Sequence, residues 1–336
     1  MDEKWLAGVD IGGTTIKMAF ISQKGGIIRK WEIPTNKNEK GKHIPSDIAK
    51  SINLHLYELK QSKDKLVGIG IGAPGPVNVQ AGTIEVAVNI GWENFPLRDL
   101  IQRETFLPVV VENDANSAAI GEMWKGAGNG AKNLICITLG TGVGGGIIVN
   151  GKLVHGENGA GGEIGHITSI RKDGILCKCG KKGCLETIAS ATGIVNLAQE
   201  ELANSEDIGR LKEDYKKSQI VTCKQIFDAV KKADKTAIRI IDQVTFHLGF
   251  ALANLANSLN PQRIVIGGGV SNAEDTLLIP LKEQFAQFAF PRVAEGVELV
   301  IAKLGNDAGV IGGAWLVKEA LINKSKGNLV AVSESC

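Results

Sequence analysis

Two stretches of the chain share a pattern of apolar runs interrupted by a turn rich in glycine and threonine. Residues 5–22 read WLAGVDIGGTTIKMAFIS, and residues 134–151 read LICITLGTGVGGGIIVNG. Each pattern predicts a strand, a tight turn and a second strand. Aligning them puts Thr138 opposite Asp10, and the two glycine turns then coincide. Two similar hairpins about one domain apart predict a duplicated architecture.

The rest of the pattern alternates between strands and helices. Residues 65–78 (KLVGIGIGAPGPVN) predict a buried strand and a loop, and residues 108–128 predict a strand, a polar turn and a helix ending at Gly126. Helical stretches follow over 192–235, and a long amphipathic helix over 238–260 ends before Pro261. The remaining predicted segments are a short strand in RIVIGGGV (263–270), a last helix over 306–322, and a fraying tail over 323–336.

We therefore predict an α/β protein of two domains with mixed sheets. The smaller domain would comprise residues 1–113 with the last helix, about 312–330, and the larger one residues 114–311, with 331–336 as a tail. A parallel Rossmann sheet is disfavoured, because the first glycine turn joins two strands and not a strand and a helix.

Composition narrows the class of protein. The chain has 336 residues, 43% hydrophobic and 22% charged, with a net charge of +2, which is typical of a globular protein and argues against nucleic acid as the main partner. The uncharged run 134–149 is shorter than the ~20 residues that span a bilayer, and the N-terminus has no signal-peptide pattern, so no membrane association is expected. Three of the six cysteines are isolated, which disfavours a disulfide framework and favours a cytoplasmic location.

Forty-two glycines gather in short runs, three of which follow apolar strands: DIGGTT, LGTGVGGG and IGGGV. A single such turn is explained by a tight hairpin or a helix cap. Three turns, the first led by an aspartate that could hold the Mg²⁺ of a nucleotide, favour a site for a triphosphate. The expected nucleotide-binding residues are Asp10, Gly12, Gly13, Thr14, Thr138, Gly140, Thr141, Gly142, Gly267, Gly268 and Gly269.

The segment 166–186, HITSIRKDGILCKCGKKGCLE, contains a histidine and three cysteines. His166, Cys177, Cys179 and Cys184 form a Cys₃His set, which is common in closed structural zinc sites. Free thiols or a disulfide are the alternatives, but buried thiols are unusual in so polar a setting. Four protein ligands leave no open position for substrate, so we expect the zinc to shape the site and not to take part in the reaction.

Asp114 lies where a predicted strand meets the first turn of a predicted helix. A carboxylate here could cap the helix, or it could accept the proton of a hydroxyl that attacks a phosphoryl group. The residues by themselves leave both interpretations open.

Six motifs together resemble the ROK family (repressors, open reading frames, kinases) of the actin-like ATPase superfamily: GVDIGGTTIK, GIGAPGPVN, ENDANSAAIGE, LGTGVGGGIIVNG, GEIGHI and CKCGKKGCLE. The resemblance covers nearly all of the chain and is greatest to the glucose-phosphorylating members. It implies an actin-like (ribonuclease H-like) fold with an interdomain cleft, and ATP-dependent formation of glucose 6-phosphate with Mg²⁺ and a structural Zn²⁺. The family's repressors carry a DNA-binding domain ahead of the first glycine turn, which here begins within a dozen residues, so a repressor is not expected.

The resemblance also implies roles for individual residues. It assigns Asp114 as the general base, and it assigns contacts with the sugar to Asn113, Asp114, Glu163, His166, Glu186, Gly75 and Asn89. For Glu163 and Glu186 the alternative is exposed surface charge, and for Gly75 it is a rigid turn. Many relatives have lysine directly after GGT, where this chain has Thr15; Lys17 comes later, and no lysine contact with phosphate is assigned.

Several alternatives stay open. Glucose and ATP are the expected partners in a homo-oligomer, either a dimer or a tetramer. N-acetylmannosamine kinase, N-acetylglucosamine kinase and fructokinase share the same motifs, and a sugar-sensing regulator without turnover is the alternative from another class. His43, His55, His155 and His247 show no ligand spacing and are interpreted as structural.

Overall fold

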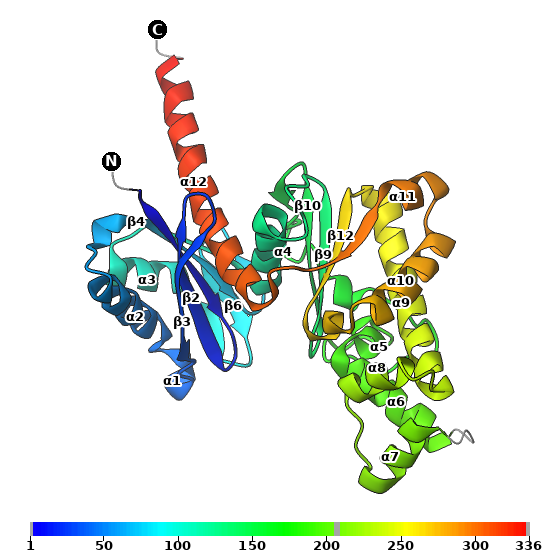
Figure 1. Ribbon diagram of the computed structural model, residues 1–336. Helices are drawn as coiled ribbons and strands as arrows, with labels where there is room; N and C mark the ends of the chain where they lie inside the picture. The colour runs from blue at the N-terminus through cyan, green and yellow to red at the C-terminus, as the bar shows by residue number, and fades with distance from the viewer. Residues whose placement is uncertain (1–2, 205–208, 334–336) are drawn as a thin grey trace. The chain divides into compact units, whose positions relative to one another are not determined.

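The computed structural model describes residues 3–204 and 209–333. The chain divides into two compact units, each of which is α/β (Figure 1). Unit 1 comprises residues 1–130, 155–161 and 306–336, and unit 2 comprises residues 131–154 and 162–305.

Unit 1 is a five-stranded sheet with helices on both faces, accompanied by a small three-stranded sheet, β5-β6-β7. Its strands are β1 (Trp5–Ile11), β2 (Thr15–Ser22), β3 (Ile27–Pro34), β4 (Leu66–Ala73), β5 (Val77–Asn78), β6 (Thr83–Ala87), β7 (Trp92–Phe95) and β8 (Val109–Asn113). Its helices are α1 (Asn38–Gly41), α2 (Ile44–Glu58), the 3₁₀ helix Lys63–Lys65, α3 (Leu97–Thr105), α4 (Asp114–Lys125) and α12 (Ala308–Ser333).

The large sheet of unit 1 has the order β3-β2-β1-β4-β8, in which β1, β2 and β3 are antiparallel and β4 and β8 run parallel to β1. Helices α2 and α3 cover one face and contribute buried apolar side chains to the core, among them Ile48, Ile52 and Leu97. Helices α4 and α12 lie on the other face.

Glycines line the face of β4 that meets α4 and α12. Gly68, Gly70 and Gly72 alternate along the strand, so they point to one side of the sheet. A Cβ added at Gly70 would lie 1.7 Å from the carbonyl oxygen of Gly313 in α12, and one at Gly72 would lie 2.9 Å from the Ser117 hydroxyl in α4. The helices can therefore lie against the sheet at backbone contact only because these residues have no side chain.

Unit 2 repeats the plan. Its strands are β9 (Leu134–Leu139), β10 (Val143–Val149), β11 (Lys152–Leu153), β12 (Arg263–Gly267) and β13 (Glu298–Ile301), in the order β11-β10-β9-β12-β13. Its helices are the 3₁₀ helix Ile164–His166, α5 (Glu186–Ala189), α6 (Ala191–Asn204), α7 (Arg210–Ser218), α8 (Cys223–Val230), α9 (Lys235–Leu259), the 3₁₀ helix Gly269–Ala273, α10 (Asp275–Phe288) and α11 (Pro291–Gly296). The 3₁₀ helix Gly305–Asp307 leads from unit 2 into α12.

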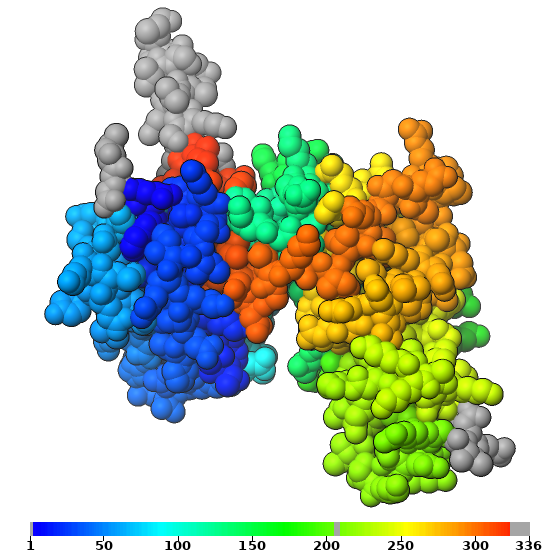
Figure 2. All heavy atoms as spheres, viewed as in Figure 1, coloured from blue at the N-terminus to red at the C-terminus, as the bar shows by residue number. Residues whose placement is uncertain are grey.

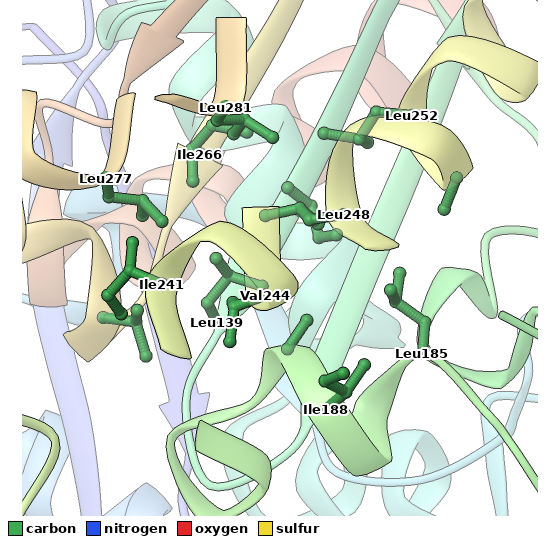
Figure 3. Packing of buried hydrophobic residues seen from close by; sticks show 14 of the residues in the cluster. Leu139, Leu185, Ile188, Ile241, Val244, Leu248, Leu252, Ile266, Leu277 and Leu281 are labelled. Carbon is green, nitrogen blue, oxygen red and sulfur yellow. The ribbon is translucent and has the colours of Figure 1, made fainter. Parts of the chain in front are cut away.

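The strand directions in unit 2 match those in unit 1, because β9 and β10 are antiparallel while β12 and β13 run parallel to β9. This confirms the predicted duplication and the mixed sheets. Its core lies between the sheet and helices α5, α9 and α10, where Leu139, Leu185, Val244, Leu248 and Leu281 meet (Figure 3). Helices α10 and α11 lie at the surface of unit 2 (Figure 2).

The structure differs from the predicted domain ranges at α4. This helix belongs to unit 1, and not to the larger domain, because it packs on α12: a Cβ at Gly312 would lie 1.7 Å from the carbonyl oxygen of Ser117. The short segment 155–161 also belongs to unit 1.

The predicted fraying of the tail is wrong for residues 323–333, where α12 continues to Ser333. This stretch contains no proline, and its one glycine, Gly327, costs a helix only about 1 kcal/mol. Residues 334–336 lie outside the described residues. Over 3–204 and 209–333, none of the helices combines the length and the apolar content that a bilayer crossing requires.

Candidate active site

Asn113 and Asp114 stand at the junction between β8 and α4. The Asn113 side-chain oxygen accepts hydrogen bonds from the backbone N–H groups of Ala115 (2.9 Å) and Asn116 (3.2 Å), so Asn113 is the N-cap of the helix. Asp114 is the first helical residue, and its carboxylate accepts a hydrogen bond from the Ala115 N–H at 2.8 Å. The positive end of the helix dipole favours the ionised form of this carboxylate.

The loop after β4 is tied to Asn113, whose amide nitrogen donates to the Gly75 carbonyl oxygen at 3.1 Å. Gly75 has a φ of +86°, and a Cβ there would lie 2.0 Å from the Val86 carbonyl oxygen. The rigid-turn interpretation of Gly75 therefore holds, and the turn is attached to the Asn113-Asp114 junction. Asn89 lies farther along unit 1, with its Cβ 3.9 Å from the position of a Cβ at Gly13.

The first glycine turn joins β1 to β2. The Gly12 N–H donates to the Thr15 carbonyl (3.0 Å), and the Thr35 hydroxyl donates to the Gly12 carbonyl (2.7 Å), so the turn is held from both sides. Thr14 is exposed.

Asp10 lies just before this turn, paired with Lys17 across the antiparallel strands. Burial raises the pKa of Asp10, and the charge of Lys17 acts in the opposite direction. The carboxylate also faces the first turn of α12, since a Cβ at Gly309 would lie 3.0 Å from each of its oxygens. Lys17 donates to the side-chain oxygen of Asn306 at 3.3 Å, so the structure directs its charge toward the start of α12.

The second and third glycine turns adjoin one another in unit 2. Thr138 and Gly267 are paired neighbours on the parallel strands β9 and β12. Gly268 has a φ of +82°, and a Cβ there would lie 2.5 Å from the backbone at the end of β9. Around Gly140 and Gly269, by contrast, no described atom lies within 4 Å of an added Cβ. These two turns therefore present open backbone, which suits an anion.

Glu186, at the start of α5, supports the second turn. Its carboxylate accepts a hydrogen bond from the Val143 N–H at 3.0 Å, and a Cβ at Gly142 would lie 2.3 Å from the same oxygen. The Thr192 hydroxyl donates to the Thr141 carbonyl at 2.9 Å. The turn is thus fixed by the residues that follow the cysteine-rich loop.

The four predicted metal ligands come together in unit 2. One ligand atom from each of His166, Cys177, Cys179 and Cys184 lies within 4.8 Å of all the others. The Cys179 and Cys184 sulfurs are 3.6 Å apart, and His166 Nδ1 is 3.7 Å from the Cys177 sulfur. Thiolates at ~2.3 Å from a tetrahedral zinc ion would be separated by roughly 3.8 Å, so the set fits Zn²⁺.

The three thiols of the cluster differ in their protonation chemistry. Burial raises the pKa of Cys177 and of Cys184, whereas the Lys181 backbone N–H lowers the pKa of Cys179. Buried thiols of this kind become metal ligands only when a cation replaces their protons.

The two ring nitrogens of His166 face different groups. Nδ1 faces the cysteines, and Nε2 lies 3.7 Å from a carboxylate oxygen of Glu163. Glu163 precedes the 3₁₀ helix Ile164–His166, and its side chain is 54% exposed, which leaves it accessible to a ligand. One ring nitrogen of His166 is thus directed to the cysteine cluster and the other to the Glu163 carboxylate.

A buried cluster behind Asp114 was not predicted. Glu112 is 2% exposed, and its carboxylate binds the Asn113 N–H (2.9 Å), the Asn116 amide nitrogen (3.0 Å) and His155 Nε2 (2.7 Å). The available signal was a glutamate in an otherwise apolar strand, VVVEN. No sequence pattern pointed to His155, which reaches Glu112 across 43 positions.

The predicted site residues divide between the units. Unit 1 holds Asp10, Gly12, Gly13, Thr14, Gly75, Asn89, Asn113 and Asp114, and unit 2 holds all the others. Within unit 1, Gly75 lies at Asn113 and Asn89 at the first glycine turn. Within unit 2, the two other glycine turns adjoin each other, and Glu186 links the second of them to the cysteine cluster through its 3.6 Å contact with the Cys177 sulfur.

Comparison with known proteins gives a consistent result. A sequence model of the ROK family matches residues 6–320. Glucokinase of Halalkalibacterium halodurans is 56% identical over 328 residues, 98% of this chain and 99% of that protein. The ROK family glucokinase from Streptomyces griseus, solved in complex with glucose and AMPPNP, is 34% identical with a TM-score of 0.74, over 94% of this chain and 99% of that one.

A second solved structure, the ROK hexokinase from Thermus thermophilus, is 30% identical with a TM-score of 0.80, over 95% of this chain and 99% of that one. With both sheets, the glycine turns and the Cys₃His cluster in place, the chain belongs to the ROK family and has its actin-like ATPase fold.

Proposed function

We propose that this chain is an ATP-dependent glucokinase, which transfers the γ-phosphoryl group of ATP to glucose and forms glucose 6-phosphate. The observation that carries the proposal is the 56% identity, over 98% of the chain, to a protein named glucokinase. The relative solved with glucose and AMPPNP supports the same pair of substrates.

Asp114 is the general base of this reaction. The hydroxyl oxygen of glucose forms a bond to the γ-phosphorus, the bond from that phosphorus to the bridging oxygen of ADP breaks, and the hydroxyl proton passes to the Asp114 carboxylate. Because Asn113 caps α4, the helix does not depend on Asp114 for its cap. The positive end of a helix also favours the ionised form of a carboxylate, which suits a base at neutral pH.

Asn113, Asp114, Glu163, His166 and Glu186 bind the sugar hydroxyls. Carboxylates and an amide suit this role, because they accept and donate hydrogen bonds that fix each hydroxyl. The junction at Gly75 holds Asn113 in position through the 3.1 Å hydrogen bond, and Asn89 is a weaker candidate for the same site.

The three glycine turns bind the phosphates of ATP, and Asp10 holds the accompanying Mg²⁺ directly or through water. When bound, Mg²⁺ neutralises phosphate charge. The open backbone at Gly140 and Gly269 supports this assignment. Zinc is held by the Cys₃His cluster, and its four protein ligands keep the loop that contains Cys177 and Glu186 folded.

Two further expectations belong to this proposal. The protein is cytoplasmic, where the thiols of its cysteine cluster stay reduced. It also forms a homo-oligomer, whose molar mass in solution would be measured by size-exclusion chromatography with light scattering.

Measurement of ADP release over a panel of hexoses and N-acetylhexosamines tests the function. We expect release with glucose, and a fall in kcat of roughly 100- to 10,000-fold in Asp114→Asn while calorimetric glucose binding persists. The control is Asp99→Asn, since Asp99 lies in the first turn of another helix of unit 1, α3, and is exposed.

Each outcome decides a different point. Near-wild-type turnover by Asp114→Asn would exclude it as the base. Release with another sugar but not glucose would reassign the substrate. An absence of sugar-dependent release with every sugar would favour a non-catalytic regulator.

A further inference from the structure

Glu112 is a charged residue in the interior of unit 1. It is the fourth residue of β8, between Val111 and the cap residue Asn113, and 3% of its side chain is exposed. Removing a carboxylate from water is costly unless hydrogen bonds and an opposite charge compensate. A purely structural position in this strand could be filled by valine, as in the three preceding residues.

One oxygen of Glu112 fixes the beginning of α4. It accepts hydrogen bonds from the Asn113 N–H at 2.9 Å and from the Asn116 amide nitrogen at 3.0 Å. These donors lie on either side of Asp114 in the chain. Asn116 is also buried, at 3% exposure, so the first turn of α4 is attached to β8 from inside.

The other oxygen of Glu112 holds the segment 155–161, which we call the strap. His155 Nε2 lies 2.7 Å from this oxygen. The strap closes on itself through a 2.7 Å hydrogen bond from the Gly161 N–H to the His155 carbonyl. A Cβ at Gly159 would lie 3.4 Å from the Val77 carbonyl, so the strap also lies against β5.

The strap belongs to unit 1, although the chain before and after it belongs to unit 2. It leads directly to Gly162 and Glu163, and Glu163 is one of the sugar-binding residues of the proposed function. The Glu112–His155 pair therefore holds the strap, which directly precedes Gly162 and Glu163 in the chain.

We propose that Glu112 is a positioning residue for phosphoryl transfer, which holds Asp114 in place through Asn113 and Asn116 and anchors the strap through His155. This inference rests on the proposed function, in which Asp114 is the base. A base acts only within a narrow range of distance and angle, and small displacements of a catalytic group reduce turnover by up to ~100-fold.

A structural role and a positioning role predict different kinetics. Loss of packing lowers the amount or the stability of folded enzyme and leaves the kinetics of the folded fraction unchanged. Displacement of the base lowers kcat of the folded enzyme, whereas nucleotide binding, which depends on the glycine turns, keeps its KM.

The test uses the full chain with the substitutions Glu112→Gln and His155→Gln. Glutamine at 112 keeps the size and one acceptor oxygen, but it presents an N–H group where the carboxylate faced His155. His155→Gln is the milder change, because its side chain is 37% exposed and the variant is expected to fold. The matched control is His43→Gln, because His43 forms an exposed pair with Glu39 at 3.4 Å.

We expect kcat to fall roughly 10- to 100-fold in Glu112→Gln and less in His155→Gln, with KM for ATP within about twofold of wild type. The double variant should lose no more than the worse single variant, since the two residues act as one unit. The control should keep the wild-type kcat. The folded fraction of each variant is measured by circular dichroism before each assay.

Wild-type kcat in folded Glu112→Gln and His155→Gln would overturn the inference and leave the proposed function standing. Additive losses in the double variant would overturn the coupling of the two residues. A wild-type chain that releases no ADP with any sugar would instead overturn the proposed function, and the inference with it.

Discussion

At the residue scale, the junction of β8 and α4 shows which residue caps the helix, a question that the sequence left open. Asn113 and Asp114 are both good helix caps, so the sequence left open whether Asp114 caps the helix or is free to be a base. The hydrogen bonds to Ala115 and Asn116 make Asn113 the cap. Asp114 retains a carboxylate at the positive end of the helix, and Glu112 fixes its neighbours. Of these three adjacent residues, Glu112 holds the start of α4, Asn113 caps it and Asp114, in our proposal, is the general base.

The Glu112–His155 pair predicts a pH dependence of stability. Its hydrogen bond with Glu112 raises the pKa of His155 above the ordinary value, although partial burial opposes the shift. A pKa raised in the folded state stabilises the protein fully below the unfolded value, about 6.5, and this stabilisation is lost as the pH rises through the folded value. The melting temperature of wild type should therefore exceed that of His155→Gln most at about pH 6 and least at about pH 9.

Differential scanning calorimetry of both proteins over this range provides the measurement. His43→Gln serves as the control. A difference between wild type and His155→Gln that stays constant over the whole range would show that the charge of His155 does not contribute.

At the element scale, the glycine-lined face of β4 determines how helices pack in unit 1. Gly8 of β1 continues the same face, since its Cβ would lie 1.9 Å from the Val310 carbonyl oxygen. Side chains elsewhere can adopt other rotamers to relieve a clash, but a carbonyl oxygen of a helix cannot move without the helix. This face is therefore less tolerant of substitution than an ordinary apolar core.

Gly70→Ala should destabilise unit 1 by about 1–3 kcal/mol or more, because its methyl group would overlap the backbone of α12. Urea unfolding followed by tryptophan fluorescence measures the loss. Gly26→Ala is the control in the same unit, since the nearest described atom to its new methyl group is the Ser22 hydroxyl oxygen at 3.4 Å. Equal stability of Gly70→Ala and wild type would mean that α12 moves away from the sheet at little cost.

Most elements could be predicted because their signals are local. The end of α4 at Gly126 and the end of α9 before Pro261 follow from residues that stop helices. The cysteine cluster was predictable for the same reason, since its ligands lie within 19 positions. The strap, the Glu112–His155 pair and the membership of α4 in unit 1 depend on contacts between distant segments, for which one sequence offers no pattern.

At the scale of the whole molecule, the two units have separate cores and can be observed separately. All five tryptophans, Trp5, Trp31, Trp92, Trp124 and Trp315, belong to unit 1. The ring centroids of Trp124 in α4 and Trp315 in α12 are 5.0 Å apart, so the fluorescence of these residues is sensitive to the contact between the two helices. The metal cluster belongs to unit 2, and its last cysteine directly precedes Leu185 of that core.

Loss of zinc should therefore destabilise unit 2 and leave unit 1 unchanged. In Cys179→Ser we expect no bound zinc and a melting transition of unit 2, followed by far-ultraviolet circular dichroism, that is lower by about 5–10 °C. The tryptophan transition should not move. Cys223→Ser is the control, because Cys223 lies outside the cluster. A metal-free Cys179→Ser with both transitions unchanged would contradict a structural role for the metal.

The position of α12 has a consequence for synthesis of the protein. The sheet of unit 1 is complete once Asn113 has been made, but the helix that covers its glycine-lined face begins at Ala308. At roughly 5–20 residues per second, the ribosome needs about 10–40 s to make the chain in between. During this interval unit 2 can fold, while the first sheet stays uncovered and available to chaperones. Completion of unit 1 thus waits for the release of the C-terminal segment.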